Sequence, residues 1–331
     1  MNSTCIFTEE GYCIALEVIR RMIGTISVLS SIFILGLIFL FRRYEFTSQR
    51  LIMYLVTATL FDALAYAVGG SVIRTSVLCT IDGFYLSLAD WGVVVWVCNI
   101  TVNLFWNVVV LRPTNRYFEV FYICSGIVVP IFFGLFPFIH NSYGPAGQWC
   151  WILGETTTGQ ILRFLTWYIP IWLIIPGLFI VFLVIIIKLS WEVRRWDPYN
   201  PASDRYRDLI RKEIKPLILY PLVFLLLNVF PSINRIQNSI ASDNPIFTLY
   251  ILHSFSSSLL GLGCTFIFVI NRETLKDLKW TNFKQTLLTR FKPRGKVVEF
   301  DASCEKQVNE HSVEVNKTSL VQQETTEGPM C

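Results

Sequence analysis

Charged side chains and histidines are scarce in this chain. Only 16% of its 331 residues are Asp, Glu, Lys or Arg, and of its 3 histidines only His253 lies in a long apolar stretch. A single histidine there cannot build bis-histidine haem ligation or a histidine-rich metal site within a membrane. The sequence therefore predicts no metal and no cofactor.

Motifs that support catalysis or photochemistry are missing too. The chain has no glycine-rich phosphate loop, no nucleophile elbow and no paired zinc-ligand motif. Its last apolar stretch, 246–270, contains no lysine for a Schiff base. The formal net charge of +4 comes from scattered residues, without a basic patch interleaved with stacking aromatics. We expect neither an enzyme nor a protein that binds nucleic acid.

Apolar sequence, by contrast, is abundant. Apolar residues make up 53% of the chain, more than in an average soluble domain. A helix needs about 20 mostly apolar residues to cross a bilayer. We therefore expect an all-α membrane protein, a seven-transmembrane helix bundle over residues 22–270 that contacts the lipid bilayer. The seven stretches are 22–41, 51–73, 82–111, 121–139, 162–189, 216–236 and 246–270.

Lysine and arginine in the loops predict the orientation, because cytoplasmic loops carry an excess of them. One face of the predicted bundle holds 23 of the 28 basic residues. We expect that face in the cytoplasm, with the N-terminal segment 1–21 outside the plasma membrane and a glycosylation sequon at Asn2. The five basic residues on the outer face are Arg20, Arg21, Arg74, Arg163 and Arg235.

The chain continues beyond the last stretch with two segments of different character. Residues 271–291 combine Leu275, Leu278 and Trp280 with intervening lysines. This pattern predicts an amphipathic eighth helix on the inner leaflet. Residues 292–331 are polar and lack an apolar period, which is typical of a disordered cytoplasmic tail.

A single cysteine stands between two tryptophans in the second outer loop, as Trp149, Cys150 and Trp151. Cys79 lies at the outer mouth of the third stretch, so both thiols face the oxidising side, where a disulfide persists. We expect them to pair and tie the loop to the third helix; two free thiols are the alternative. Cys5 and Cys13 share the outer side, and the sequence leaves their pairing open.

Two carboxyl groups fall inside apolar stretches, Asp62 in "LFDALAY" and Asp90 in "LSLADWG". A charge at mid-bilayer costs roughly 2.5 kcal/mol or more unless it is paired or hydrated. Each carboxyl is either a switch or ligand contact, or a hydrogen-bonded group inside the bundle. A small-solute transporter or channel with both in its pathway is the alternative function, although the two halves of the chain show no repeat.

Helix breakers in the last three stretches make hinges plausible. Proline removes a backbone donor and kinks a helix, and glycine weakens it. Among these breakers we expect Pro221 and Gly261, together with Asp62, to act in switching. On the third stretch, Asn99, Asn103 and Asn107 recur every four residues, and such polar stripes commonly hold helices together. The breakers are Pro170, Pro176, Pro221, Pro231, Gly261 and Gly263.

Several pieces of sequence resemble the cyclic-AMP-receptor-like family (class E) of G-protein-coupled receptors, the slime-mould receptors and their animal orphan relatives. They lie between about residues 40 and 272, and a remoter likeness exists to the secretin/adhesion group. The pieces are "FTSQRLIMYL", Cys79 with "DGFY", "WCWI", "KPLILYPLVFLLLNVFPSINRI" and "LHSFSSSLLGLG".

The resemblance implies a receptor whose sixth helix opens at its inner end and admits a heterotrimeric G protein. Rhodopsin-like receptors have an acidic-Arg-aromatic triplet at the end of the third helix, which acts as an activation lock. This chain has "WNVVVLRP" at that place, so the activation lock cannot be carried over. Basic residues of the inner loops would meet the partner, or they simply anchor the helices. They are Arg112, Arg116, Arg194, Arg195, Arg205, Arg207, Arg211 and Lys212.

The outer half of the bundle is the expected site of an extracellular ligand. Arg74, Arg163 and Arg235 could ring a pocket for an anion, or they snorkel to the interface without any ligand. The family scaffold does not transfer a ligand. The candidate pocket residues are Asp90, Trp149, Trp151, Arg163, Tyr168, Arg235 and His253.

Overall fold

The computed structural model describes two units, Met1–Asn282 and Phe283–Cys331. The described residues are 7, 10–69, 76–112, 114–146, 149–154, 156–194, 210, 214–240, 244–271, 274–275, 283–284 and 286–288. In the second unit these are two short helical pieces, so most of the predicted eighth helix and all of the tail 292–331 lie outside them. So do several residues singled out above: Asn2, Cys5, Arg74, Arg195, Arg205, Arg207, Arg211 and Lys212.

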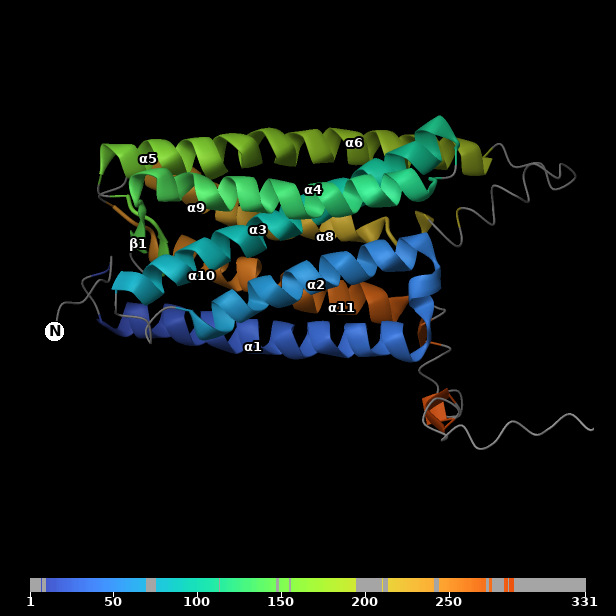
Figure 1. Ribbon diagram of the computed structural model, residues 1–331, viewed down its shortest axis with the longest axis horizontal. Coiled ribbons are helices and arrows are strands. Elements are labelled where there is room, and N and C mark those ends of the chain that lie inside the picture. The colour runs from blue at the N-terminus through green and yellow to red at the C-terminus, as the bar shows by residue number, and fades with distance from the viewer. Residues whose placement is uncertain are drawn as a thin grey trace, which may run out of the picture. The chain divides into compact units, whose positions relative to one another are not determined.

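The first unit is a bundle of long helices that run side by side (Figure 1). Six helices are long and apolar enough to cross a membrane, and the bent pair α10 and α11 makes a seventh crossing. The predicted seven-helix membrane bundle is therefore confirmed. Its helices are α1 (Glu10–Leu40), α2 (Thr47–Val68), α3 (Ser76–Phe105), α4 (Arg116–Leu135), α5 (Thr157–Arg163), α6 (Ile169–Arg194), α8 (Leu219–Leu227), α9 (Val229–Ile240), α10 (Phe247–Ser258) and α11 (Leu260–Ile270).

Short helical pieces of other types connect or extend these helices. The 3₁₀ helices are η1 (Arg43–Glu45) and η3 (Phe136–His140), and the π-helices are η2 (Trp106–Val110) and η4 (Phe164–Tyr168). Because η4 joins α5 to α6 without a loop, the fifth crossing is one continuous helical segment.

The first helix begins at Glu10, well before the predicted start at residue 22. The polar residues that interrupt its apolar pattern are compatible with a helix. Glu17 and Arg21 form an i,i+4 salt bridge of 2.9 Å, and Arg20 is buried against the bundle. Charged side chains that pair along a helix stabilise it, so the residues expected as an N-terminal segment form its first turns.

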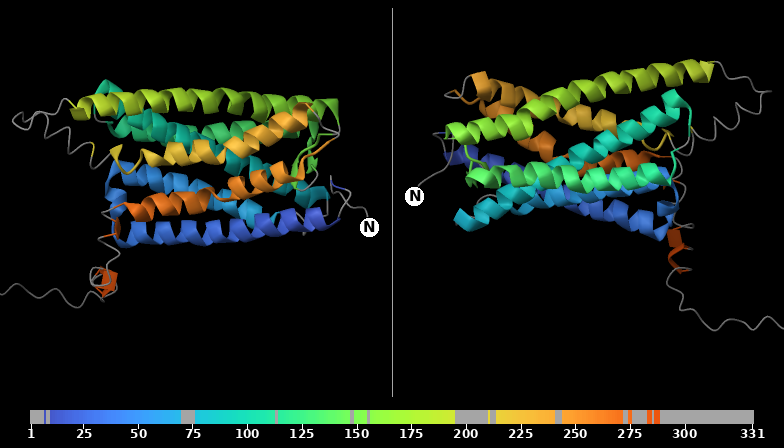
Figure 2. Two further views of the ribbon diagram at one scale, coloured as in Figure 1. Left: turned by 180° about the vertical axis from the view of Figure 1, so that it is seen from behind. Right: turned by 45° about the horizontal axis from the view of Figure 1, so that its top comes forward.

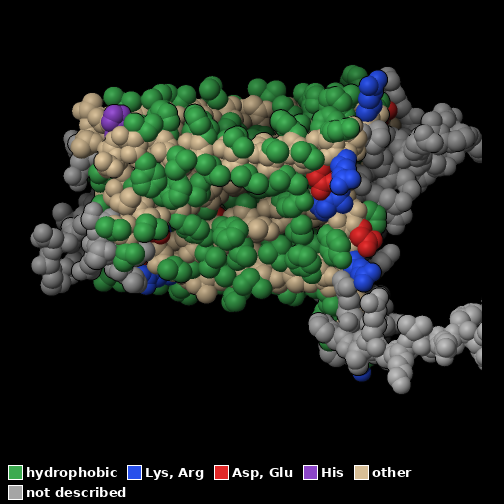
Figure 3. All heavy atoms as spheres, in the orientation of Figure 1, with side chains coloured by type: hydrophobic (Ala, Val, Ile, Leu, Met, Phe, Trp, Pro, Cys, Tyr) green, Lys and Arg blue, Asp and Glu red, His purple; other side chains and the backbone are tan. Residues whose placement is uncertain are grey.

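The surface of the bundle is apolar over most of its length. Figure 3 shows hydrophobic side chains across the middle, with charged side chains gathered at the end where α2 and α4 begin. Leu29, Leu173 and Phe266 are each more than half exposed. Large exposed apolar side chains are costly in water and favourable in lipid. The exterior therefore fits a bilayer, as the composition predicts.

The sixth crossing is broken at Asn228, between α8 and α9. Pro231 has no N–H and cannot bond to the carbonyl of Leu227, which weakens the helix at this point. At the same break, the side-chain amide of Asn228 donates to the carbonyl of Phe224 over 2.8 Å. Pro221 lies within the first turn of α8, where a missing donor is tolerated.

The seventh crossing bends by 49° between α10 and α11, at Leu259 (Figure 2). Ser27 on α1 donates its hydroxyl to the carbonyl of Ser258, beside the break. A Cβ at Gly261 would stand 2.9 Å from Ser31 Oγ and 3.0 Å from Ser27 Cβ. Gly261 thus permits the close approach of α1, and the break falls two residues before it.

The asparagine stripe on α3 is buried, as the sequence predicts. Asn99 donates to the carbonyl of Tyr122 and to Ser125 Oγ, both over 3.1 Å, and so joins α3 to α4. Asn103 on α3 and Asn107 in η2, which continues α3, are also buried. At Asn99 the polar side chain holds two helices together, which is the commoner role of such residues in membranes.

Candidate functional site

A two-stranded antiparallel hairpin covers one end of the bundle, which we call the hairpin end. Its strands are β1 (Tyr143–Pro145) and β2 (Cys150–Ile152), with Gly144 opposite Trp151. Cys150 forms a disulfide of 2.04 Å with Cys79 near the start of α3, so the predicted pairing is confirmed. Cys13 is also disulfide-bonded, while Cys5, the partner that the sequence offers, lies outside the described residues.

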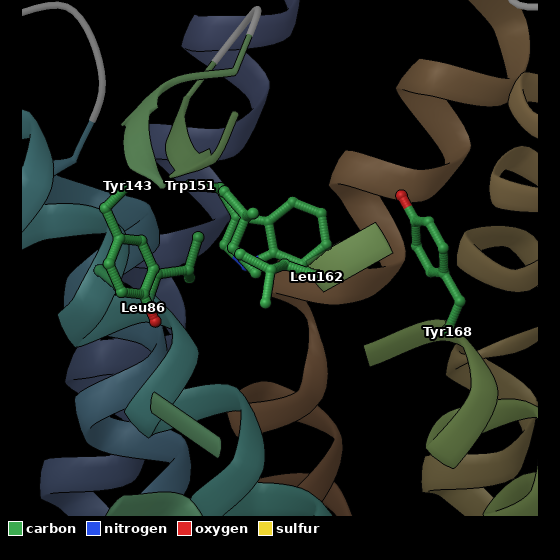
Figure 4. Packing of buried hydrophobic residues seen from close by; sticks show 7 residues of the cluster. Leu86, Tyr143, Trp151, Leu162 and Tyr168 are labelled. Atoms are coloured by element: carbon green, nitrogen blue, oxygen red, sulfur yellow. The ribbon is translucent and has the colours of Figure 1, made fainter. Parts of the chain in front are cut away.

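The hairpin is packed tightly against the bundle. Figure 4 shows Trp151 pointing inward, with Leu86 and Tyr143 on one side and Tyr168 on the other. The Tyr143 hydroxyl donates to the carbonyl of Gly134 over 2.8 Å. Burial raises the pKa of Tyr143 to about 12, so the phenol remains a hydrogen-bond donor at neutral pH. The hairpin is therefore a fixed cover over the helices.

Arg163 holds the hairpin in place. Its Nε donates to the carbonyl of Ile152 over 2.7 Å, and its Nη2 donates to the same oxygen. Its guanidinium also lies 5.4 Å from the Trp151 ring. Hydrogen bonds from a charged donor are about twice as strong as neutral ones. This arginine therefore supports the cover, while its predicted contact with a ligand stays a prediction.

A cavity of about 100 Å³ lies beneath the hairpin. Arg235, from α9, borders it within reach of three rings. The guanidinium carbon is 5.4 Å from the Trp149 ring, 5.2 Å from Trp151 and 6.0 Å from Tyr168. Cation–π contacts of this kind orient an arginine and limit its motion. Two tryptophans of the hairpin loop and a tyrosine of η4 thus hold the guanidinium of Arg235 at the edge of the cavity.

The two buried carboxyls meet in this cavity, from facing sides of α2 and α3. Asp62 and Asp90 both border it, and a side-chain hydrogen bond links them. An ionised carboxylate only accepts hydrogen bonds, so this bond needs at least one proton between the two groups. Tyr66 also hydrogen-bonds to Asp90 and lies in electrostatic range of Arg20 and Arg235. The pair therefore carries at most one negative charge, in electrostatic range of Arg235.

His253 on α10 is a polar residue in the wall of the cavity. Its Nδ1 is 2.9 Å from the amide nitrogen of Asn234 on α9, and both side chains are buried. The amide nitrogen is a donor, so Nδ1 accepts and the proton of a neutral ring is on Nε2. The Trp149 ring lies 5.8 Å away, edge to face. This bond ties α9 of the sixth crossing to α10 of the seventh.

Arg20 is a cavity residue that the sequence reasoning missed. It is buried on α1, and its Nη2 donates to the carbonyl of Gly69 at the end of α2 over 2.6 Å. A cation at a helix C-terminus is stabilised by the helix dipole. In the sequence, Arg20 is a charged residue just before the first apolar stretch. It entered the prediction of orientation only as one of the basic residues that flank that stretch.

The structure brings together most of the predicted pocket. Pro221 lies within α8 and Gly261 within α11, while the breaks lie at Asn228, three residues before the predicted breaker Pro231, and at Leu259, two residues before Gly261. The roles of these residues in switching stay predictions. The predicted residues that border the cavity are Asp62, Asp90, Trp149, Trp151, Tyr168, Arg235 and His253.

The opposite end of the bundle carries the described part of the predicted partner surface. Arg112, Arg116 and Arg194 are exposed there. Near them, Arg50 at the start of α2 forms a two-pronged salt bridge with Glu119 on α4, in which Nη2 lies 2.7 Å from Oε2. Paired hydrogen bonds of this geometry are directional, so the beginnings of α2 and α4 are held together.

Comparison with known proteins decides the family. A sequence model described as slime mold cyclic AMP receptor matches residues 11–323, nearly the whole chain. The chain belongs to this family. With seven crossings, it is a multi-pass membrane protein of the G-protein-coupled receptor type, as the sequence motifs implied.

Several relatives of the slime mold cyclic AMP receptor family have curated names. Cyclic AMP receptor-like protein A of Dictyostelium discoideum is 24% identical over 93% of this chain and 74% of its own length. Cyclic AMP receptor 1 of the same organism is 28% identical over 69% of this chain, and G-protein coupled receptor 1 of Arabidopsis thaliana is 26% identical over 72%. This chain spans only 54% of cyclic AMP receptor 1 and 56% of cyclic AMP receptor 2.

Proposed function

We propose that this protein is a plasma-membrane receptor that transmits an extracellular signal to a heterotrimeric G protein through outward movement of the inner end of the sixth crossing. The hairpin end faces outside, together with the N-terminus, because the basic loops lie at the other end. The observation that carries the proposal is the position of the cavity, which reaches the breaks in both the sixth and the seventh crossings.

Residues on each side of both breaks border the cavity. Asn228 and Pro231 do so at the break in the sixth crossing, and Ser257 and Leu260 do so at the break in the seventh. A ligand in the cavity would touch the points where backbone hydrogen bonding is weakest. A ligand shifts a conformational equilibrium only through contacts that differ between the two states. Contacts at a hinge meet that condition directly.

The proposed partner surface lies at the opposite end. Arg112, Arg116 and Arg194 are exposed there, and they complement an acidic partner surface. The remaining predicted contacts belong to the inner loop after α6, outside the described residues. The family favours this function over the transporter alternative and over an enzyme, because the relatives described above are named as receptors. Their names do not transfer a ligand to this chain.

The experiment is recruitment of a panel of engineered Gα proteins in cells, without ligand and at matched surface expression. We expect one subtype to be recruited by the wild type and less so by a variant with Arg205→Ala, Arg207→Ala and Arg211→Ala. A second comparison tests the hinge. Pro231→Ala restores the missing donor and should change recruitment, whereas Pro176→Ala, within α6, should not.

Two results would contradict the proposal. One is recruitment of no Gα subtype by the wild type or by either proline variant. The other is solute flux in proteoliposomes that disappears when Asp62 and Asp90 are both replaced by asparagine, since this would place the carboxyls in a transport pathway.

A further inference from the structure

Each of the two cations that border the cavity has an acidic neighbour. Asp62 and Asp90 are joined by a hydrogen bond and carry at most one negative charge, and Arg235 lies in electrostatic range of Asp90. The other cation, Arg20, donates to Gly69 and lies near Asp82. An ion that enters a site of low dielectric constant without a counter-charge is strongly disfavoured. A ligand with a single net charge would leave one charge in this cavity uncompensated.

One acceptor in the cavity wall has no donor. Asp62 is 5% exposed, and its Oδ1 is without a hydrogen-bond partner in the part of the chain that the structure describes. Buried carboxyl oxygens are nearly always satisfied, because an unmade hydrogen bond there is costly. An N–H or O–H group of a ligand would satisfy it.

The walls and the size of the cavity restrict the shape and the size of a ligand that could fit. Tyr168 and Trp172 stack with centroids 5.8 Å apart and planes 16° from parallel, and both border the cavity with Trp149 and Trp167. Flat rings pack well on such walls. The volume of about 100 Å³ is below the roughly 300 Å³ of ordinary ligand pockets and nearer to a cavity of about 150 Å³ known to bind benzene.

We propose that the cavity binds an uncharged, single-ring aromatic compound that donates an N–H or O–H hydrogen bond to Asp62. This names the class of ligand for the receptor function proposed above, and it rests on that function for its biological meaning. The ring lies against the aromatic wall, and the donor meets Oδ1 of Asp62. Arg235 and Arg20 keep their present partners.

The test compares four fluorinated probes by ligand-observed ¹⁹F NMR on the full-length protein in lipid nanodiscs, with empty nanodiscs as background. 4-Fluorophenol has a donor and no charge; 4-fluoroanisole has the same ring without the donor. 4-Fluorobenzoate and 4-fluorobenzylammonium carry opposite charges. We expect 4-fluorophenol to bind about tenfold more tightly than the others, the factor expected from one buried hydrogen bond to a carboxyl.

Two variants locate the binding. Asp62→Leu removes the acceptor and should abolish the preference for 4-fluorophenol over 4-fluoroanisole. Asp82→Asn, close to Arg20 but at a carboxyl outside the proposed contact, should retain it. The wild-type comparison does not depend on the folding of either variant.

Each other outcome overturns the proposal. Equal binding of 4-fluoroanisole shows that the donor is irrelevant, and stronger binding of either charged probe shows that the cavity favours a charged ligand. Binding of none of the probes above the nanodisc background excludes the single-ring class. Gα recruitment is measured separately, so the ligand class can fail while the receptor function stands, and the reverse.

Discussion

The indole Nε1 of Trp91 on α3 donates a hydrogen bond to the backbone carbonyl of Thr166 over 3.1 Å. Thr166 lies in η4, and the residue four positions later is Pro170, which has no N–H to offer this carbonyl. The carbonyl four residues before this proline thus accepts a hydrogen bond from another helix. The same indole stacks on Phe133 at 4.0 Å, so α3, the fourth crossing and the fifth crossing meet at one side chain.

Replacing Trp91 with phenylalanine should therefore destabilise the protein by about 1–3 kcal/mol through the unsatisfied carbonyl alone. Trp96→Phe is the matched control, because Trp96 is a buried tryptophan on the same helix that stacks on Tyr54. Thermal unfolding in nanodiscs compares the two. A cost for Trp96→Phe equal to or above that for Trp91→Phe would contradict the role of the hydrogen bond.

Pro170→Ala provides a second check on the same bond. It restores the N–H, so the Trp91→Phe substitution should cost less in the Pro170→Ala background than in the wild type. A double-mutant cycle measures this coupling, and additive costs would show that the indole and the proline act independently.

The contact of the hairpin with α3 depends on Gly83. A Cβ there would stand 3.0 Å from Tyr143 Cδ1 and 3.1 Å from Trp151 Cα, both on the hairpin. Gly83→Ala should displace the hairpin and increase hydrogen exchange over residues 143–152. Gly92→Ala, on the same helix, meets only Ala58 Cβ at 3.7 Å and should stabilise the helix by up to about 1 kcal/mol. Equal exchange in both variants would argue against close packing at Gly83.

The disulfide closes a long loop, because Cys79 and Cys150 are separated by 71 in sequence. Removing it by the double substitution to serine should cost about 4 kcal/mol from the increased entropy of the unfolded chain. Reductant should then lower the Tm of the wild type but have a smaller effect on the variant. Cys124→Ser, at an exposed free cysteine, serves as the control and should leave the Tm unchanged. A double variant as stable as the control would show that the bond contributes little.

Arg163→Met tests whether this arginine supports the hairpin. It removes both donors to the Ile152 carbonyl, and bonds from a charged donor are worth about 1.5–3 kcal/mol. Arg21→Met removes an arginine from a partly exposed i,i+4 pair and should cost at most about 0.5 kcal/mol. Unfolding temperatures with hydrogen exchange at residues 150–153 compare the two. Unchanged hydrogen exchange of the hairpin in Arg163→Met would contradict the supporting role of Arg163 and favour a ligand contact instead.

Features that depend on local pattern, or on the side of the membrane on which a residue lies, could be predicted from the chain alone. The seven crossings follow from apolar stretches, and the pairing of Cys79 with Cys150 follows from the orientation of the loops. The buried stripe that begins at Asn99 follows from the helical repeat. Each of these features depends only on the order of residues along the chain and on the bilayer and water around it.

The hydrogen-bond partners of polar groups between helices, by contrast, became visible only in the folded bundle. The bend at Leu259 lies beside the Ser258 carbonyl, which accepts a hydrogen bond from Ser27 on another helix. Arg163 became a support for the hairpin because the Ile152 carbonyl lies within its reach. Such partners come from residues far apart in the sequence, and no local pattern encodes them.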